Sequence, residues 1–247
     1  IGIANSNGEY TYYSTLSASL AAASSGDTIE LFADIEERFN DSSVSGSLKN
    51  NVNFNFNGHT YFYTGSQAGV YGLLNDSGTA VTCSFFNGKL KYREHNNNSL
   101  SNEILRITST DSLITFNGFE FEIDKHVGTY GSSQAIYNAG TIIGPTIIAT
   151  VRDSSIFMET GFGVKGGFVR NCHIHAKAGD GHNQVATTGG TYNSYIRVDS
   201  GNSGYDGITA YADTIDNIVE HTSVNGGSAI KIEGALARVY GGIIIGK

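Results

Sequence analysis

Apolar and polar residues alternate in short strand-like runs along the chain, and one short motif punctuates these runs. Phe-Asn-Gly occurs at Phe56–Gly58, Phe86–Gly88 and Phe116–Gly118, at a constant spacing of 30 residues. Each copy lies between two runs, so the repeated unit is predicted to be a strand, a corner and a second strand. Asn and Gly both tolerate positive φ angles, which suits a sharp corner. Asn-Gly is also the strongest short signal for a β-hairpin, so the motif alone leaves both a solenoid and a series of hairpins open.

The constant period favours a solenoid, in which successive coils stack like residues on like residues. Phe56, Phe86 and Phe116 would then form one aromatic column inside the coils. In the second half of the chain the repeat is looser, and we expect insertions between its strands. The aligned apolar residues there predict one inward column at Ile156, Ile174, Ile196, Val224 and Ile243, and another at Val164, Val185, Ile208 and Ile230. Such ladders of apolar residues at coil length are what a parallel β-helix needs.

One segment, Ser14–Ser25, has helical rather than strand periodicity. Leu16, Leu20 and Ala23 share one helical face, Ser14 is the expected N-cap, and Gly26 is expected to end the helix. A helix placed before the first coil would shield apolar side chains and strand edges. We therefore divide the chain into a cap at 1–28 and β-helix coils at 29–247. The C-terminus shows no matching cap and the N-terminus no leader, so we expect a processed chain, a fragment, or an end covered by a partner chain.

Composition and charge narrow the class of protein. The chain has 32 glycines, 1 proline, 39% hydrophobic and 15% charged residues, which describes neither a disordered chain nor a collagen. The net charge of −8 makes a nucleic acid a poor partner. No apolar run of about 18 residues exists, so we expect no membrane insertion. Cys83 and Cys172 have no metal-like spacing and are expected to lie several coils apart, too far for a disulfide.

Two segments near the N-terminus carry a family resemblance. The helical stretch leads into Gly26–Ile29, and the run Val52–Phe56 leads into the corner Asn57–Thr60. This opening resembles that of pectin-lyase-like right-handed parallel β-helix proteins, a superfamily of polysaccharide lyases, glycoside hydrolases, surface adhesins and phage tailspikes. The resemblance is specific over residues 16–60 and generic beyond, and it implies an all-β, right-handed parallel β-helix with a short N-terminal capping helix. Lyase members often follow the first strand with a Pro-Gly loop, whereas Ala33–Arg38 has no proline, so the chain looks more like the surface-protein and viral-fibre branch.

A first candidate site follows from that resemblance. Enzymes of the superfamily act on the long outer face of the solenoid, where hydrolysis needs two carboxylates about 5–10 Å apart. Asp206-Gly and Lys231-Ile-Glu233 are expected on consecutive coils, with Asp180-Gly-His182 just upstream of the equivalent strand. They resemble parts of polygalacturonase motifs, although the glycine expected after His182 and an adjacent aspartate pair are missing. The resemblance implies Asp180, Asp206 and Glu233 as acid and base with Lys231 beside them, whereas the alternative is that Asp-Gly is ordinary turn chemistry.

A second candidate site comes from the stacking of two strands. We expect His173, His175 and Lys177 to stack over Tyr195, Arg197 and Asp199 of the next coil. Two imidazoles one pleat apart can bind a metal, but no third ligand is evident and no metal is assigned. Tyr and Arg beside His suit a sugar, through stacking and hydrogen bonds, while the alternative is a solvated polar strand. The candidate substrate-binding residues are His173, His175, Lys177, His182, Tyr195, Arg197 and Tyr211.

A third group of charged residues has mainly a structural interpretation. Lys89, Lys91 and Arg93 are expected one coil before Glu120, Glu122 and Asp124. Opposite charges on neighbouring strands contribute about 0.2–1 kcal/mol each, which favours a stabilising charge ladder. Recognition of a carboxylate or a sugar is the second interpretation.

These observations lead to two functional expectations. The first is a carbohydrate-recognising β-helix domain of a phage tailspike, tail-fibre or cell-surface adhesin type. It would bind surface polysaccharide as a homotrimer, outside the cell or on a virion. The alternative is a polysaccharide-degrading enzyme, a lyase or glycoside hydrolase acting on an acidic polysaccharide. Only the lyase alternative brings in a cofactor, Ca²⁺ held by Asp or Glu carboxylates to neutralise a uronate.

Overall fold

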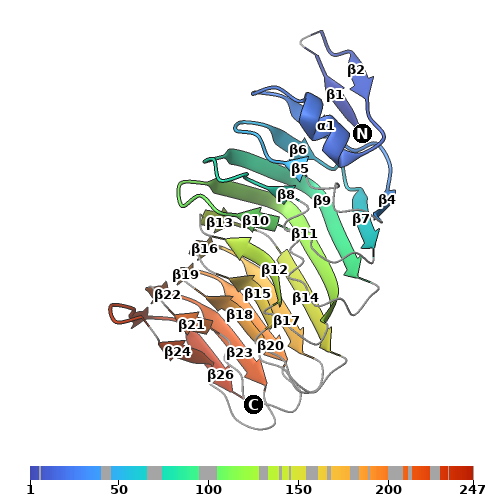
Figure 1. Cartoon of the computed structure of the whole chain (residues 1–247). Coiled ribbons are helices and arrows are strands. Elements are labelled where there is room, and N and C mark those ends of the chain that lie inside the picture. The colour runs from blue at the N-terminus through green and yellow to red at the C-terminus, as the bar shows by residue number, and fades with distance from the viewer. Residues whose placement is uncertain are drawn as a thin grey trace.

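The chain forms a parallel β-solenoid with one short helix at its N-terminal end (Figure 1). The structure is a computed structural model, and it describes residues 1–5, 7–39, 46–65, 74–94, 105–127, 133–138, 141–144, 146–153, 161–165, 168–178, 184–188, 190–199, 208–210, 213–222, 229–232 and 234–246. Strands of successive coils pair in parallel, so the Asn-Gly corners are bends within a coil of the solenoid and not the turns of hairpins.

Each coil passes through three stacks of strands, which we call stacks A, B and C. Stack A contains β3 (Thr28–Glu30), β6 (Asn53–Asn55), the first parts of β9 (Thr82–Glu94) and β11 (Leu113–Val127), β13 (Thr141–Ile143), β16 (Phe168–Arg170), β19 (Gly190–Tyr192), β22 (Thr214–Ile215) and β25 (Val239–Tyr240). Stack B contains β4 (Ile35–Phe39), β7 (Thr60–Gly65), the second parts of β9 and β11, β14 (Thr146–Asp153), β17 (His173–Ala178), β20 (Tyr195–Asp199), β23 (Ile218–Thr222) and β26 (Ile243–Gly246). Stack C is a sheet of β5 (Gly46–Ser47), β8 (Leu74–Asn75), β10 (Leu105–Ile107), β12 (Ser133–Asn138), β15 (Gly161–Lys165), β18 (Gln184–Thr188), β21 (Ile208–Ala210) and β24 (Ile230–Ile232).

The aromatic column inside stack A shares only one member, Phe116, with the expected column. Phe54, Phe85 and Phe116 pair in register, and their ring centroids lie 4.2 Å and 5.0 Å apart. The register advances by 31 residues per coil, whereas the Phe-Asn-Gly motif repeats every 30, so the motif moves by one position along the strand. A shift of one residue turns a side chain to the other face of a strand. Phe86 is therefore only half-buried and was wrongly placed in the column. Phe56 is buried but is not a member either, because Phe54 takes that position.

The expected columns of the second half are confirmed only in part. Ile174 pairs with Ile196 as expected, but the column continues through Ile147, Val219 and Ile244. Ile243 pairs instead with Ile218. Ile156 and Val224 lie outside the described residues. The coils are unequal, with 27 residues from Ile147 to Ile174 and 22 from Ile174 to Ile196. Because the repeat has no constant length, aligning short similar stretches of sequence did not give the correct register.

The column of stack C also contains an unexpected residue. Ile208 pairs with Ile230, as expected, but its other neighbour is Thr187. Val164 pairs with Thr187 and so belongs to this column as expected, whereas Val185 pairs with Phe162, two positions earlier on the same strands. A threonine within an otherwise apolar column gives no hydrophobic signal, which explains why Val185 was wrongly chosen.

The corner between stacks A and B is built in the same way coil after coil. From Asn57 onward, each described A-to-B corner has a residue with positive φ: Asn57, Asn87, Gly118, Gly144, Asn171, Asn193, Asp216 and Gly241. Asn, Asp and Gly are the residues that adopt this conformation most readily, so the corner chemistry read from the sequence is confirmed. Corner side chains also bond between coils, since Asn193 Nδ2 donates to Asn171 Oδ1 at 2.8 Å.

The N-terminal segment covers the first coil. Helix α1 (Leu16–Ala22) buries Leu16 and Leu20, and β1 (Gly2–Ala4) pairs antiparallel with both β2 (Tyr10–Tyr12) and β3. The N-cap is Thr15, whose hydroxyl accepts from the Ala18 backbone N–H, and not Ser14 as expected. The helix ends at Ala22 with an extended C-cap, three residues before the positive-φ Gly26, so Gly26 does not end it as expected.

Two further properties of the chain are the state of the two cysteine thiols and the absence of a membrane-spanning helix among the described residues. Cys83 and Cys172 are buried and free, as expected from their separation, and burial raises the pKa of each thiol to about 12. Within the described residues, no helix has the length and apolar content needed to cross a bilayer.

Candidate functional site

The outward side of stack B carries two groups of side chains that are candidates for a functional site, which we name the histidine cluster and the groove. The histidine cluster comprises His173, His175, Tyr195, Arg197 and Asp199 on β17 and β20. The groove is lined by Asp34, Ile35, Glu36, Thr60, Phe62, Lys89, Lys91 and Glu122 on and beside β4, β7, β9 and β11. Because alternate residues of a strand point to the same side, both groups share one long face of the solenoid.

The register brings the histidine cluster together as expected from the sequence. His173 pairs with Tyr195, His175 with Arg197 and Lys177 with Asp199. The His173 and Tyr195 rings meet edge to face with centroids 4.7 Å apart. Nothing is described of the Lys177 side chain, so its contribution to the cluster stays a prediction.

Asp199 contacts two other members of the cluster, His175 and Arg197. Its carboxylate lies 2.7 Å from His175 Nε2 and accepts from Arg197 Nε at 3.2 Å. Partial burial alone would raise the pKa of Asp199, but the hydrogen bonds from His175 and Arg197 bring it below its ordinary value. A hydrogen bond to Glu220, which lies on the next coil, raises the pKa of the Tyr195 phenol. The cluster therefore presents an ionised carboxylate, a guanidinium and an aromatic edge in fixed positions.

This chemistry suits a sugar better than a metal ion. Among the described residues, no three His, Cys, Asp or Glu side chains converge as metal ligands. The Nε2 of His175 is already engaged by Asp199, while Arg197 has 47% of its side chain exposed. The same absence of convergence holds for the Asp and Glu carboxylates that Ca²⁺ would need, so within the described part of the chain we derive no step through calcium.

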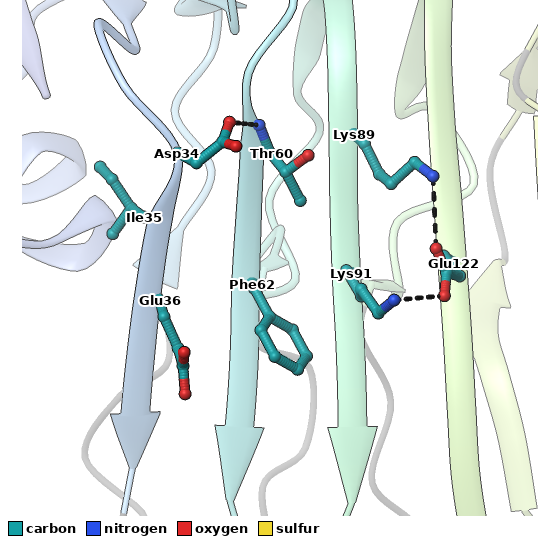
Figure 2. A pocket seen from close by; sticks show the side chains of 8 residues that line it. All are labelled: Asp34, Ile35, Glu36, Thr60, Phe62, Lys89, Lys91 and Glu122. Atoms are coloured by element: carbon teal, nitrogen blue, oxygen red, sulfur yellow. Dashed lines mark hydrogen bonds and ion pairs between the residues drawn. The ribbon is translucent and has the colours of Figure 1, made fainter.

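The groove has a volume of about 450 Å³ and opens on the same face, closer to the N-terminal cap. Figure 2 shows Phe62 between Glu36 on one side and Lys91 on the other, in the register that pairs these three residues. The Lys91 ammonium lies 5.7 Å from the centre of the Phe62 ring. Asp34 accepts a hydrogen bond from the Thr60 backbone N–H at 2.8 Å and lies 3.4 Å from His59 Nδ1.

The lysines of the groove belong to the charge ladder expected from the sequence. Lys89 contacts Glu120 at 2.8 Å and Glu122 at 3.2 Å, and Lys91 contacts Glu122 at 2.6 Å. The hydrogen bond with Glu120 is the main reason why the pKa of Lys89 is raised. Burial alone would raise the pKa of Glu122, but Lys91 and Lys89 bring it below its ordinary value. The backbone register also pairs Arg93 with Asp124, as expected.

The proposed catalytic residues are not brought to this face by anything that the structure describes. Asp180, Asp206 and Glu233 lie outside the described residues, as do the binding candidates His182 and Tyr211. Lys231 lies on β24 of stack C, where its Cα pairs with that of Thr209. Its strand thus belongs to a different stack from the histidine cluster.

The acidic and aromatic part of the groove was not predicted from the sequence. Asp34, Glu36, Thr60 and Phe62 were not singled out, although Thr60 and Phe62 alternate directly after the Asn57 corner. The positive-φ residue of a corner determines which residues of the following strand point outward. Applied to the Asn57 corner, this rule would have identified Thr60 and Phe62 as outward residues. Their alignment with Lys89 and Lys91 depends on the coil length and had no signal of its own.

Comparison with known proteins gives no further guide to function. No protein-family model, no curated protein and no solved structure matches the chain.

Proposed function

We propose that this β-solenoid is a carbohydrate-recognising domain that binds a surface polysaccharide along the outer face of stack B. The proposal extends to the setting expected from the sequence, a homotrimeric tailspike, tail-fibre or surface-adhesin type of protein outside the cell or on a virion. The observation that carries it is the histidine cluster, in which an aromatic pair and an anchored guanidinium lie side by side on consecutive coils.

Each part of the cluster has a role in binding a glycan. The Tyr195 and His173 rings offer apolar surface to the C–H face of a sugar ring, while the hydrogen bond to Glu220 holds the Tyr195 hydroxyl. Arg197 offers several N–H donors to hydroxyl groups, and its bond to Asp199 limits the rotamers that binding must fix. Strands about 4.8 Å apart repeat these contacts along the solenoid axis, which suits an extended polymer.

A glycan array followed by calorimetry tests the proposal. We expect Tyr195→Ala and Arg197→Ala each to weaken binding of the selected glycan by about tenfold, since each removes a ring contact or a charge-assisted hydrogen bond. Tyr12→Ala and Arg238→Ala are the matched controls, because Tyr12 lies in the cap and Arg238 beside stack A, both exposed. Equal losses in the controls, or no glycan bound at all, would refute the proposal.

The same samples test the enzymatic alternative and the assembly. Release of reducing ends or of unsaturated uronates, abolished in Asp206→Asn, would replace the binding proposal with a polysaccharide-degrading one. Light scattering over a wide range of concentrations tests the homotrimer, and a monomer throughout would remove that part.

A further inference from the structure

The groove on the N-terminal half of stack B has a charge pattern of its own. Three carboxylates, those of Asp34, Glu36 and Glu122, line it together with two ammonium groups, so its lining is net negative. Both lysines are engaged by glutamates of the next coil, and Glu120, just outside the lining, adds a further negative charge to this network. A ligand anion would have to displace one of these glutamates to reach a lysine.

The carboxylates of the other wall face solvent, although Asp34 also accepts from the Thr60 backbone N–H and lies near His59. Asp34 has 75% of its side chain exposed, and Glu36 is exposed. Phe62 is half-buried between this acidic wall and Lys91, and Figure 2 shows its ring beside the Glu36 side chain. Acidic and basic walls are two strand spacings apart, roughly 10 Å, which is wide enough for one sugar ring over Phe62.

We propose that the groove is a binding subsite for a sugar carrying a free, positively charged amino group. The ammonium group binds between the carboxylates of Asp34 and Glu36, and the C–H face of the ring packs on Phe62. Thr60 and Lys89 lie beside it as partners for hydroxyl groups. The inference deepens the proposed glycan-binding function, on which its choice of a sugar rests.

A groove that binds an amino sugar would not suit the acidic polysaccharide expected under the enzymatic alternative. An acidic polysaccharide would place its carboxylates beside Asp34 and Glu36, where repulsion opposes binding. An N-acetylated sugar has the same ring but no charge, so it forms the Phe62 contact without the ion pairs. The amino group is therefore the feature by which the groove distinguishes one glycan from another.

Calorimetry with three oligosaccharides of equal length tests the inference. The probes are oligomers of glucosamine, of N-acetylglucosamine and of galacturonic acid, each titrated into the full chain at low salt. We expect the glucosamine oligomer to bind at least about tenfold more tightly than the other two, since only it forms charge-assisted hydrogen bonds with both carboxylates. Raising the salt to about 0.5 M should weaken that binding further, because part of the groove is open to water.

Variants assign the binding to the groove. Glu36→Gln and Phe62→Ala should each weaken glucosamine binding by about tenfold, whereas Glu9→Gln in the cap and Phe168→Ala on stack A should leave it unchanged. Thermal melting of each variant checks that its fold is intact, and Glu36→Gln lies at an exposed position that should not affect folding.

The outcomes separate this inference from the proposed function. Loss of glucosamine binding in the groove variants but not in Tyr195→Ala supports the amino-sugar subsite. Loss in Tyr195→Ala alone overturns the groove assignment and leaves the glycan-binding proposal standing. Equal affinity for glucosamine and N-acetylglucosamine, or no binding of the glucosamine oligomer, overturns the ammonium assignment.

Discussion

Asp76 is predicted to be a buried clamp between two coils, and replacing it with asparagine should destabilise the solenoid. Asp76 directly follows β8 and is 1% exposed. Its Oδ2 accepts from the backbone N–H groups of Thr108 and Ser109, at 2.9 Å and 2.8 Å, and from Ser112 Oγ at 3.1 Å. Its Oδ1 accepts from Gly78 N at 3.1 Å and from Thr108 Oγ1 at 2.7 Å.

The size of the effect follows from this geometry. The side chain of asparagine has one oxygen where aspartate has two, and its other terminal group is an NH₂ donor. In one orientation this NH₂ group faces the Gly78 N–H. In the other it faces the N–H groups of Thr108 and Ser109. At least one partly buried donor then lacks an acceptor, at a cost of about 1–3 kcal/mol. The remaining bonds lose their charged acceptor, and such bonds are roughly half as strong. We therefore expect Asp76→Asn to lower the free energy of unfolding by about 3 kcal/mol.

Urea unfolding followed by circular dichroism at pH 7 measures this loss. Asp213→Asn is the matched control, since Asp213 accepts from the backbone and side chain of the exposed Arg238 and should change stability by less than about 1 kcal/mol. Burial would raise the pKa of Asp76, but the bonds from Ser109 and Thr108 bring it below its ordinary value. The native state therefore binds fewer protons than the unfolded state, and the advantage of wild type over Asp76→Asn should shrink as the pH falls below about 4. An Asp76→Asn loss no larger than that of the control, or one that is constant with pH, would refute the reasoning.

Two further predictions concern the A-to-B corners and the partly buried Glu37 on β4. A methyl group at Gly144, where φ is +86°, would overlap the Phe116 carbonyl oxygen, whereas at Gly58, where φ is +84°, it would meet open space. Urea unfolding should therefore show a loss of about 1–2 kcal/mol for Gly58→Ala, from backbone strain alone, and of about 3 kcal/mol or more for Gly144→Ala. Equal losses would contradict the overlap. Burial raises the pKa of Glu37, which accepts a hydrogen bond from the Tyr61 hydroxyl, so the native state binds the proton more tightly than the unfolded state. The stability of wild type relative to Glu37→Gln should then fall as the pH rises from about 4.3 through the raised pKa, in thermal melts of both proteins recorded across this range.

The architecture could be predicted from local chemistry, because a parallel β-helix repeats the same corner. Asn57 and Asn87 marked corners through their tolerance of positive φ, and the helix signal at Leu16 and Leu20 was equally local. The register could not be predicted in the same way. It depends on coil length, and a difference of one residue between the motif period and the coil placed Phe86 on the wrong side of its strand.

The candidate site shows the same division between local and long-range information. His173 and His175 were correctly stacked over Tyr195 and Arg197, because both strands follow two-residue corners that keep them in phase. The groove was missed because Glu36, on β4, and Lys91 belong to coils of different length. No pattern in the sequence reveals which outward residues of unequal coils become neighbours.

The repeated corner between stacks A and B has a consequence for how this chain tolerates change. From Ile143 onward, two residues separate each strand of stack A from the next strand of stack B, even though coil lengths vary from 22 to 27 residues. Differences in coil length therefore occur in the other connections of the coil, and they do not change how stack B is positioned relative to stack A. Peptides inserted or deleted away from this corner would change the rim of the outer face while its floor kept the same alignment, so new specificities can be grafted without rebuilding the scaffold.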